Sequence, residues 1–359
     1  MKFIDSIVEK ENKCLKALSE CRASGYPTYI LGAGQVAGIV EARARGFKFE
    51  GRLVNRAYYK EAKDTYCLED FFSTYIGKVN LIVGYRDFNE SSLAPYCDKI
   101  NMLLNYDIWA GNPAVDPDIM TYDFVLEHEA DLSAFYDDLS DEYSRTVLSA
   151  YINQKIASEW KYLCKTKTAP QYFEDLMPLG TKEVFVDCGA YDGDSAEDFI
   201  QALKARGINE WKQIYSFEPD PVNFKKLVAR GFCNHTCINK GTSDSAGKLT
   251  LSMGGTSSAF DANGDVTVPI NTIDDEVHDD VTLIKMDIEG AELASLHGAE
   301  QTILKCKPKM AICIYHKKED LWEIWQYLKS LVPEYKFYVR NYADWCCELV
   351  LYAIPSETL

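Results

Sequence analysis

The sequence predicts an α/β protein with two parallel-sheet domains joined by a helical segment, and three observations lead to this prediction. Residues 27–46, PTYILGAGQVAGIVEARARG, read as a short apolar strand, a glycine turn and a helix. Strand-like and helix-like stretches alternate from Glu183 to the end of the chain. Residues 118–165 show the apolar spacing of two or three helices. Strands that alternate with helices are typical of parallel sheets covered on both faces.

The amino-terminal elements predict a small Rossmann-like domain over residues 1–115. Residues 1–24 are expected to form one amphipathic helix, because apolar residues recur on one side of it. These residues are Ile4, Ile7, Val8, Leu15 and Leu18. Strand-like runs follow at 51–55 and 78–85, with the helical stretch EDFFSTYIG between them. Residues 116–170 would then form a helical linker.

The larger domain is expected to span residues 171–359. Its last two strand-like runs, KFYVRNY and CELVLYAIP, are separated only by the short link ADWC. Parallel strands need a long crossover connection, whereas antiparallel strands need only a tight turn. The final pair should therefore lie antiparallel at one edge of an otherwise parallel sheet.

Charge and hydropathy exclude several classes of protein. The chain has 55 acidic and 38 basic residues, a formal net charge of -17. Nucleic acid is bound through clustered Lys and Arg, so this balance argues against a nucleic-acid partner. No apolar window approaches the roughly 20 residues of a membrane span, and the start lacks a signal-peptide core. We expect a soluble, cytoplasmic protein in which most of the twelve irregularly spaced cysteines are reduced core residues.

Two motifs follow neighbouring strands of the larger domain. In FVDCGAYDGD, residues 185–194, Asp187 ends a strand, and the glycines that follow allow the backbone to turn close to a ligand. Glu218 ends the next strand, in IYSFEPD. An acid at that position can accept both hydroxyls of a ribose. The alternative is that Asp187 caps a helix and Glu218 is a solvated loop acid.

A third motif, KMDIEGAE at residues 285–292, places three carboxylates around one glycine. Asp287, Glu289 and Glu292, here called the acidic cluster, follow the apolar run 281–284. Ligands of open α/β sheets bind at the carboxyl ends of the strands, so these acids are candidate site residues. Glu289 and Glu292 could instead stabilise the start of the next helix through its dipole.

Residues 171–342 resemble the FkbM-type family of S-adenosylmethionine-dependent methyltransferases. The matching pieces, in the expected order, are QYF, VDCGAYDGD, FEPD, SDSAG, GGTSSA, NTIDD, KMDIEGAE and PKMAICIYH. The resemblance implies a Rossmann-like seven-stranded class I methyltransferase sheet with an antiparallel last hairpin. It also implies that S-adenosylmethionine is the cofactor.

The resemblance implies which residues hold that cofactor. Its methionine end would lie against the turn after the first strand, its ribose against the end of the second, its adenine near the turn after the third, and its sulfonium beside Asp287. The implied positions are Asp187, Gly189, Ala190, Gly193, Glu218, Pro219, Gly241, Thr242 and Asp287.

The acceptor side is predicted from the same strand ends. His316 closes the strand MAICIY at the edge that carries Asp287, so it is a candidate general base; the alternative is a histidine that only bonds its own loop. Ser257 and Ser258, in a flexible loop that could be a lid, are candidate substrate contacts with Glu289 and Glu292. The acidic cluster and His316 could also bind a divalent metal, but no metal is favoured.

The amino-terminal LGAGQVAG, residues 31–38, is close to a dinucleotide fingerprint. The second strand of that domain ends in Val54, Asn55 and Arg56, where a dinucleotide site should offer an acid. Arg56 could meet the phosphate of a nucleotide sugar, but a structural or dimer-forming domain is the favoured interpretation.

The predicted function is transfer of a methyl group to a hydroxyl of a sugar, glycan precursor or related polar metabolite. The substrate class comes from the resemblance, because a fold does not fix the acceptor. One alternative is an N-methyltransferase of the same fold, in which acids rather than a histidine base would surround the acceptor. The other is a non-catalytic nucleotide-binding protein.

Overall fold

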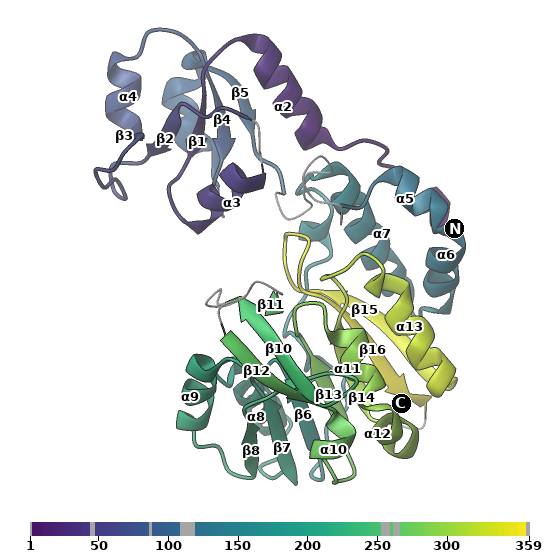
Figure 1. Cartoon of the computed structure of the whole chain (residues 1–359). Helices are drawn as coiled ribbons and strands as arrows, with labels where there is room; N and C mark the ends of the chain where they lie inside the picture. The colour runs from purple at the N-terminus through teal and green to yellow at the C-terminus, as the bar shows by residue number, and fades with distance from the viewer. Residues whose placement is uncertain are drawn as a thin grey trace.

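The computed structural model describes residues 2–43, 47–85, 88–107, 119–252, 259–260 and 266–356 of the 359-residue chain. Figure 1 shows a smaller domain at the amino-terminal side and a larger one that holds most of the chain. Each has its own parallel sheet, as the sequence predicts. None of the helices in the described ranges is both long and apolar enough to cross a bilayer. All twelve cysteines are free, but only five of them are buried, so the expectation that most lie in the core is wrong.

The smaller domain has a five-stranded sheet in the order β3-β2-β1-β4-β5, and every neighbouring pair is parallel. The strands are β1 (Thr28–Leu31), β2 (Gly51–Val54), β3 (Thr65–Cys67), β4 (Val79–Val83) and β5 (Ile100–Leu104). The helices are α2 (Lys13–Ser24), α3 (Gln35–Arg43), α4 (Leu68–Thr74) and the 3-10 helix η1 (Glu90–Lys99). Two separate apolar clusters, around Leu53 and around Ile30, form its core.

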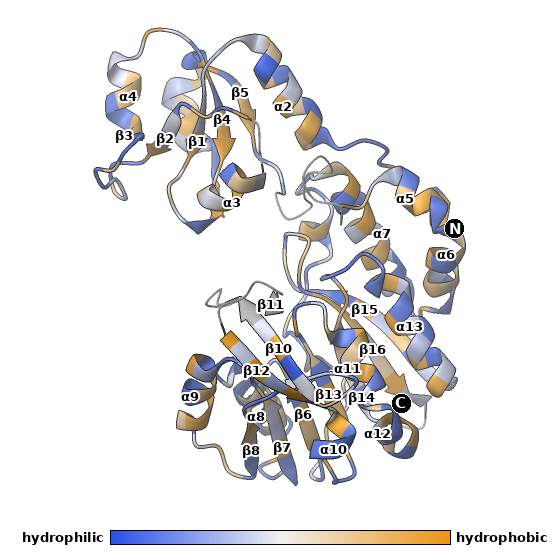
Figure 2. Cartoon of the chain, in the orientation of Figure 1, coloured by the Kyte–Doolittle hydropathy of each residue, from blue (hydrophilic) through white to orange (hydrophobic). Residues whose placement is uncertain are grey.

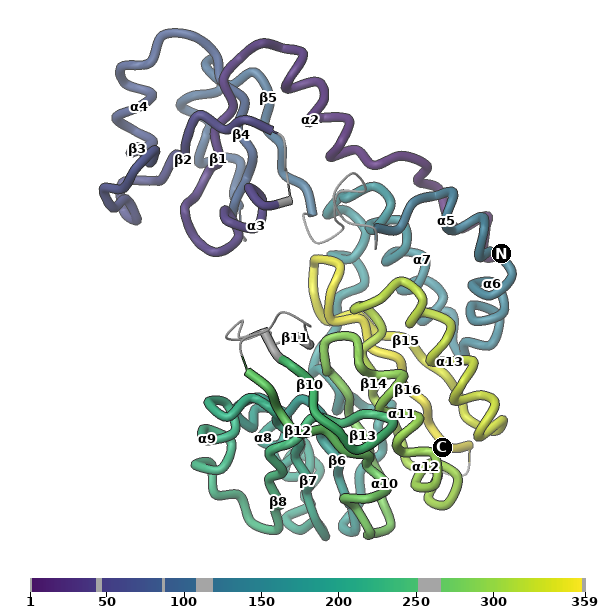
Figure 3. The backbone as a smooth tube through the Cα atoms, viewed as in Figure 1, coloured from purple at the N-terminus to yellow at the C-terminus, as the bar shows by residue number. Residues whose placement is uncertain are grey.

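The predicted single helix over residues 1–24 is wrong. Two helices form instead, α1 (Phe3–Ser6) and α2, because the Asn12 side chain caps α2 by accepting from the backbone N–H of Leu15 at 3.0 Å. Val8, expected on the buried side, is 62% exposed. Phe3 and Ile7 are buried in the core of the larger domain. The backbone therefore starts on the larger domain and crosses to the smaller one, as Figure 3 shows.

The chain passes between the two domains twice, and both connecting segments are hydrogen-bonded to Ser158. On the way out, the Asn12 side-chain amide donates to the Ser158 hydroxyl at 2.9 Å. On the way back, the Asp107 backbone N–H donates to the Ser158 carbonyl at 2.8 Å. Ser158 is fully buried and ends its helix in the left-handed conformation. The predicted domain of residues 1–115 thus begins with a helix, α1, that packs into the core of the larger domain.

Three helices follow, in agreement with the prediction of two or three. They are α5 (Tyr122–Glu127), α6 (Glu129–Asp138) and α7 (Glu142–Ala157). Their buried residues, among them Leu132, Phe135 and Val147, belong to the same apolar cluster as the larger sheet. These helices are therefore packed on the larger domain rather than forming a free linker.

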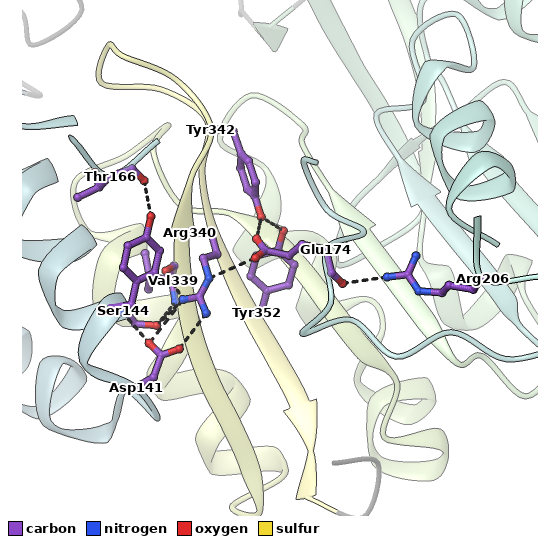
Figure 4. A network of polar contacts seen from close by, with 10 residues as sticks. Asp141, Ser144, Thr166, Glu174, Arg206, Val339, Arg340, Tyr342 and Tyr352 are labelled. Atoms are coloured by element: carbon purple, nitrogen blue, oxygen red, sulfur yellow. Dashed lines mark hydrogen bonds and ion pairs between the residues drawn. The ribbon is translucent and has the colours of Figure 1, made fainter. Parts of the chain in front are cut away.

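A buried cation ties these helices to the edge of the larger sheet, as Figure 4 shows. Arg340 lies on the edge strand, and its guanidinium pairs with Asp141 at 2.8 Å and donates to Ser144 at 2.9 Å, both at the start of α7. It also lies 3.5 Å from Glu174, which accepts a hydrogen bond from Tyr342. A buried charge needs such partners, so this network fixes the position of α7 on the sheet.

The larger sheet has seven strands in the order β15-β16-β14-β13-β6-β7-β8. They are β6 (Val184–Cys188), β7 (Gln213–Phe217), β8 (His235–Ile238), β13 (Leu283–Met286), β14 (Lys309–Cys313), β15 (Tyr335–Asn341) and β16 (Leu349–Pro355). Only β16 runs against its neighbours β14 and β15. The predicted antiparallel final pair is therefore confirmed.

Helices cover the two faces of this sheet, and a separate apolar cluster fills each side. They are α8 (Asp194–Ala205), α9 (Pro221–Ala229), α10 (Ile273–Glu276), α11 (Glu292–His297), α12 (Glu300–Cys306) and α13 (Asp320–Leu331). Figure 2 shows hydrophobic residues along the inner strands and mixed colouring on the helices. A small sheet of β9 (Gly241–Thr242), β10 (Gly247–Ser252), β11 (Ala259–Phe260) and β12 (Val266–Asn271) lies beside it.

The register of the central strands brings their carboxyl ends to one edge. Cys188 at the end of β6 is level with Phe217 of β7 and with Met286 of β13. Met286 is in turn level with Ile312 of β14. The residues that follow these four strands therefore meet, and they include most of the predicted site residues.

Candidate active site

A cavity of about 370 Å³ lies at this edge of the larger sheet. Seven predicted residues line it, and they are Gly189, Glu218, Pro219, Gly241, Thr242, Asp287 and Glu289. Five others lie around it without lining it, and they are Asp187, Ala190, Gly193, Glu292 and His316. Ser257 and Ser258 lie outside the described residues. The strand ends thus provide the cavity with residues that follow β6, β7 and β13.

Gly189 allows the end of β6 to pass close to the end of β13. Its φ of +78° is in the left-handed region, and an added Cβ would lie 2.0 Å from the Asp287 carbonyl oxygen. The backbone N–H groups of Gly189 and Ala190 both donate to the Phe217 carbonyl, at 3.1 and 3.0 Å. This turn therefore needs glycine both for its conformation and for its space.

We expect Gly189→Ala to lower the free energy of unfolding by at least about 3 kcal/mol, since a backbone clash adds to the left-handed penalty. Gly207 is a matched control, because its φ is +76° and no heavy atom lies within 4 Å of its added Cβ. Gly207→Ala should cost about 1 kcal/mol, the left-handed penalty alone. Urea unfolding measures both changes, and equal values would show that the contact with Asp287 does not matter.

Glu218 is buried and held by two backbone donors. One carboxylate oxygen accepts from the Tyr191 N–H and the other from the Asp220 N–H, both at 2.8 Å. Burial raises the pKa of Glu218 to about 7 despite these donors. Each oxygen of a carboxylate has two acceptor positions, so one on each oxygen remains for a ligand. The geometry suits a pair of adjacent hydroxyls.

Asp187 differs from the prediction, because its side chain is fully buried and does not line the cavity. Its carboxylate lies 3.1 Å from the ammonium of Lys285, which itself is 2% exposed and does line the cavity. Lys285 also donates to the Gly189 carbonyl at 2.8 Å. Burial disfavours the charge on Lys285, but Asp187 and Asp287 raise its pKa overall, so it remains a cation.

Asp287 accepts hydrogen bonds from two tyrosines that come from different segments. The Tyr172 hydroxyl donates to one oxygen at 3.2 Å, and the Tyr315 hydroxyl donates to the other at 3.0 Å. Burial favours the neutral acid, but Lys285 and His316 outweigh it and lower the pKa of Asp287. The carboxylate therefore stays ionised and fixed in orientation.

His316 differs from the predicted general base. Its Nδ1 lies 2.9 Å from Glu292, and its Nε2 lies 3.6 Å from both Asp287 and Glu289. Burial lowers the pKa of His316, but these carboxylates raise it to about 9. The imidazole is therefore protonated at neutral pH, and it does not line the cavity, so it is poorly placed to accept the acceptor's proton.

The structure separates the two remaining acids of the cluster. Glu292 is fully buried and accepts from the Ile288 backbone N–H at 2.9 Å, so it supports the turn as well as facing His316. Glu289 lines the cavity with its side chain 35% exposed. Burial raises the pKa of Glu289, although His316 acts in the opposite direction. Glu289 is therefore the member of the pair that can meet a ligand.

Eleven of the cavity residues were not predicted, and four of them contribute polar groups discussed here: Gln171, Tyr172, Lys285 and Glu348. Gln171 donates to Glu348 at 2.5 Å, and both residues line the cavity. Lys285 and Tyr172 stand inside the matched motifs KMDIEGAE and QYF, so a signal for them was present. Glu348 lies in the turn of the last hairpin, where no local pattern marks it.

In the smaller domain, Gly32 of the predicted fingerprint has a φ of +113°, and an added Cβ would lie 3.1 Å from the Gly84 carbonyl oxygen. Arg56 pairs with Asp70 at 2.5 Å, and its backbone N–H donates to Glu69. A carboxylate of this chain thus already meets the guanidinium that was considered for a phosphate.

Residues 187–338 match the family model of the methyltransferase FkbM domain. The crystal structure of methyltransferase FkbM from Methylobacillus flagellatus KT is similar to this chain, with a TM-score of 0.78, 21% identity and 98% coverage of each chain. Because the coverage is nearly complete, the shared fold includes the smaller domain. No curated protein matches the sequence.

Two other solved structures match about half of this chain. An rRNA methylase from Streptococcus thermophilus has a TM-score of 0.32 and 16% identity, over 49% of this chain and 87% of its own. SMU.1697c from Streptococcus mutans, solved with SAH, has a TM-score of 0.32 and 13% identity, over 49% and 90%. The family match and the parallel sheet that carries its motifs lead to one conclusion: the chain is an S-adenosylmethionine-dependent methyltransferase that contains an FkbM-type methyltransferase domain over residues 187–338.

Proposed function

We propose that the protein transfers the methyl group of S-adenosylmethionine to a hydroxyl of a sugar, glycan precursor or related polar metabolite. The observation that carries this proposal is the polarity of the cavity. Its lining includes the polar side chains of Glu218, Asp287, Glu289, Gln171 and Glu348. A polyhydroxylated acceptor suits a wall of hydrogen-bond acceptors.

The cavity residues fit the cofactor. The two open acceptor positions of Glu218 match the two ribose hydroxyls, and Gly241 and Thr242 line the wall beyond it. The ionised Asp287 suits the neighbourhood of a cation. When bound, the cofactor supplies a methyl group activated by its positive sulfonium.

Glu289 is the residue to which we assign proton acceptance from the acceptor hydroxyl, in place of His316. Neutral hydroxyls are weak nucleophiles, and a base is most effective when its pKa approaches the working pH. Burial moves the pKa of Glu289 in that direction, whereas Lys285 and His316 move that of Asp287 away from it. Asp287 then orients the acceptor, and His316 Nε2 lies 3.6 Å from both carboxylates.

The test combines a binding step and a transfer step. The purified protein is titrated calorimetrically with S-adenosylmethionine and SAH, and transfer of labelled methyl to a panel of sugars is then measured. Glu289→Gln should leave SAH affinity unchanged and reduce turnover by about 10²- to 10⁴-fold. Glu323→Gln changes an exposed glutamate of α13 and is the control. Full turnover by Glu289→Gln would exclude it as the base.

One specific observation favours N-methylation as a second candidate. Six acids line the cavity, among them Asp287, Glu289 and Glu348, and an ammonium group would be attracted to them. Offering equal concentrations of amino sugars and their neutral counterparts distinguishes the two functions, because mass spectrometry of the product shows whether nitrogen or oxygen carries the methyl group.

A further inference from the structure

We infer that Asp287, Glu292 and His316 form a binding site for a divalent cation of the first transition row, next to the methyl-transfer cavity. Two carboxylates with one imidazole are a mixed oxygen and nitrogen ligand set. Such a set suits ions such as Mn²⁺ or Zn²⁺, since imidazole is a poor ligand for Mg²⁺ and Ca²⁺.

The spacing of the three side chains fits a common ion. One ligand atom from each lies within 4.8 Å of the others. The 3.6 Å between His316 Nε2 and Asp287 Oδ1 is too long for a hydrogen bond. Two ligands bonded to one ion at about 2.1 Å in a tetrahedron lie roughly 3.4 Å apart. Small side-chain shifts would therefore bring these groups to coordination distance, and the ion would displace the proton that His316 carries in its absence.

A second observation points independently to a ligand, namely buried polar atoms without partners. Among the described residues, Glu292 Oε2 and both ring nitrogens of His316 are buried and make no hydrogen bond. The Glu292 side chain is 0% exposed and that of His316 is 8% exposed. His316 Nδ1 is at ion-pair distance from Glu292 Oε1, 2.9 Å, but without hydrogen-bond geometry. Leaving such groups unpaired is costly, and a bound ion would satisfy Glu292 and one ring nitrogen of His316.

The local charge also favours a cation. Glu289 and Glu348 add two more carboxylates near the three ligands, while Lys285 is already balanced by Asp187 at 3.1 Å. Because Asp287 lines the cavity, the open coordination positions would face the acceptor. A hydroxyl bound there would lose its proton more easily, with Glu289 beside it to accept the proton. This role, unlike the site itself, rests on the proposed transfer to a hydroxyl.

Manganese is the probe for the test, with no acceptor present. The EDTA-treated full-length protein is titrated with Mn²⁺ and followed by calorimetry and by the electron paramagnetic resonance of free Mn²⁺. We expect one bound ion per chain and at least tenfold weaker binding by His316→Asn and by Glu292→Gln. His297→Asn removes another histidine, on α11, and Asp198→Asn removes an acid that lines the cavity from α8; both should keep the affinity.

The result overturns the inference if the wild type binds no Mn²⁺, or if His316→Asn binds as tightly as His297→Asn. Circular dichroism checks folding, and Glu292→Gln decides the matter if His316→Asn is unfolded. A parallel SAH titration separates the two proposals. Loss of SAH binding by Glu218→Ala with unchanged Mn²⁺ binding would support two separate sites. Mn²⁺ binding by a wild type that binds no SAH would support the ion site alone, whereas SAH binding without Mn²⁺ binding would refute only the ion site.

Discussion

Lys285→Met is expected to lower the free energy of unfolding by about 3–5 kcal/mol, because it leaves a partner charge buried without compensation. Asp187 is fully buried and has Lys285 as its ion-pair partner at 3.1 Å. The substitution also removes the hydrogen bond to the Gly189 carbonyl, which fixes the turn above the cavity. Domains are stable by only about 5–15 kcal/mol, so this loss is a large share.

A second buried pair provides a matched control for that experiment. Lys309 pairs with Glu183 at 2.7 Å at the opposite, amino-terminal edge of the sheet. Lys309→Met should reduce the urea midpoint by a similar amount but leave SAH affinity intact at concentrations where the protein is folded. Lys285→Met should weaken SAH binding as well. Equal SAH affinity in both variants would restrict Lys285 to a structural role.

Replacing both Asp187 and Lys285 should recover part of the free energy of unfolding that Lys285→Met loses. In Asp187→Asn with Lys285→Met, no full charge is left buried at this position, so the double variant should be more stable than Lys285→Met alone. If the two changes simply add, the pair interaction does not explain the loss.

Glu218→Ala is expected to weaken SAH binding by about 100-fold or more, since hydrogen bonds to a charged group contribute roughly 1.5–3 kcal/mol each and two would be lost. Calorimetric titration measures the change. Glu197→Ala serves as the control, because Glu197 lies on α8 and pairs with Arg230 at 2.8 Å outside the cavity lining. A Glu218→Ala protein that binds SAH normally would remove Glu218 from the cofactor site.

The raised pKa of Glu218 gives this prediction a pH dependence. Ribose hydroxyls donate to the ionised carboxylate, so SAH affinity should increase as the pH rises through about 7 and then level off. The raised pKa of Glu218 also affects the stability of the ligand-free protein, and this effect of rising pH has the opposite sign. The folded state binds more protons at Glu218 than the unfolded state does, so the contribution of Glu218 to stability is lost between the ordinary pKa and about 7.

The sequence predicts which residues meet at the cavity where they directly follow a strand. Glu218 and Asp287 were found because each is the first acid after an apolar run, and the parallel register then brings them together. Glu348 could not be found this way, because its partner Gln171 is 177 residues distant. The charge state of His316 depends on three carboxylates that meet only in the folded chain.

The same reasoning explains the error at the amino terminus. Apolar spacing favours one long helix over residues 1–24, but the cap at Asn12 starts a new helix and leaves the first residues free to pack elsewhere. Periodicity shows which face of a helix is buried, yet it does not show which domain buries it.

The smaller domain is in effect an insertion into the larger one. Since α1 completes the larger core before the chain departs, deletion from the start would expose the apolar pocket that Phe3 and Ile7 fill. A shortened protein has to keep α1 and remove an internal segment instead. Two connecting segments join the domains, and both are hydrogen-bonded to Ser158. A single protease cut in one segment would therefore leave the domains joined by the other. Two attachment points also restrict the domain to hinge-like bending and oppose free rotation.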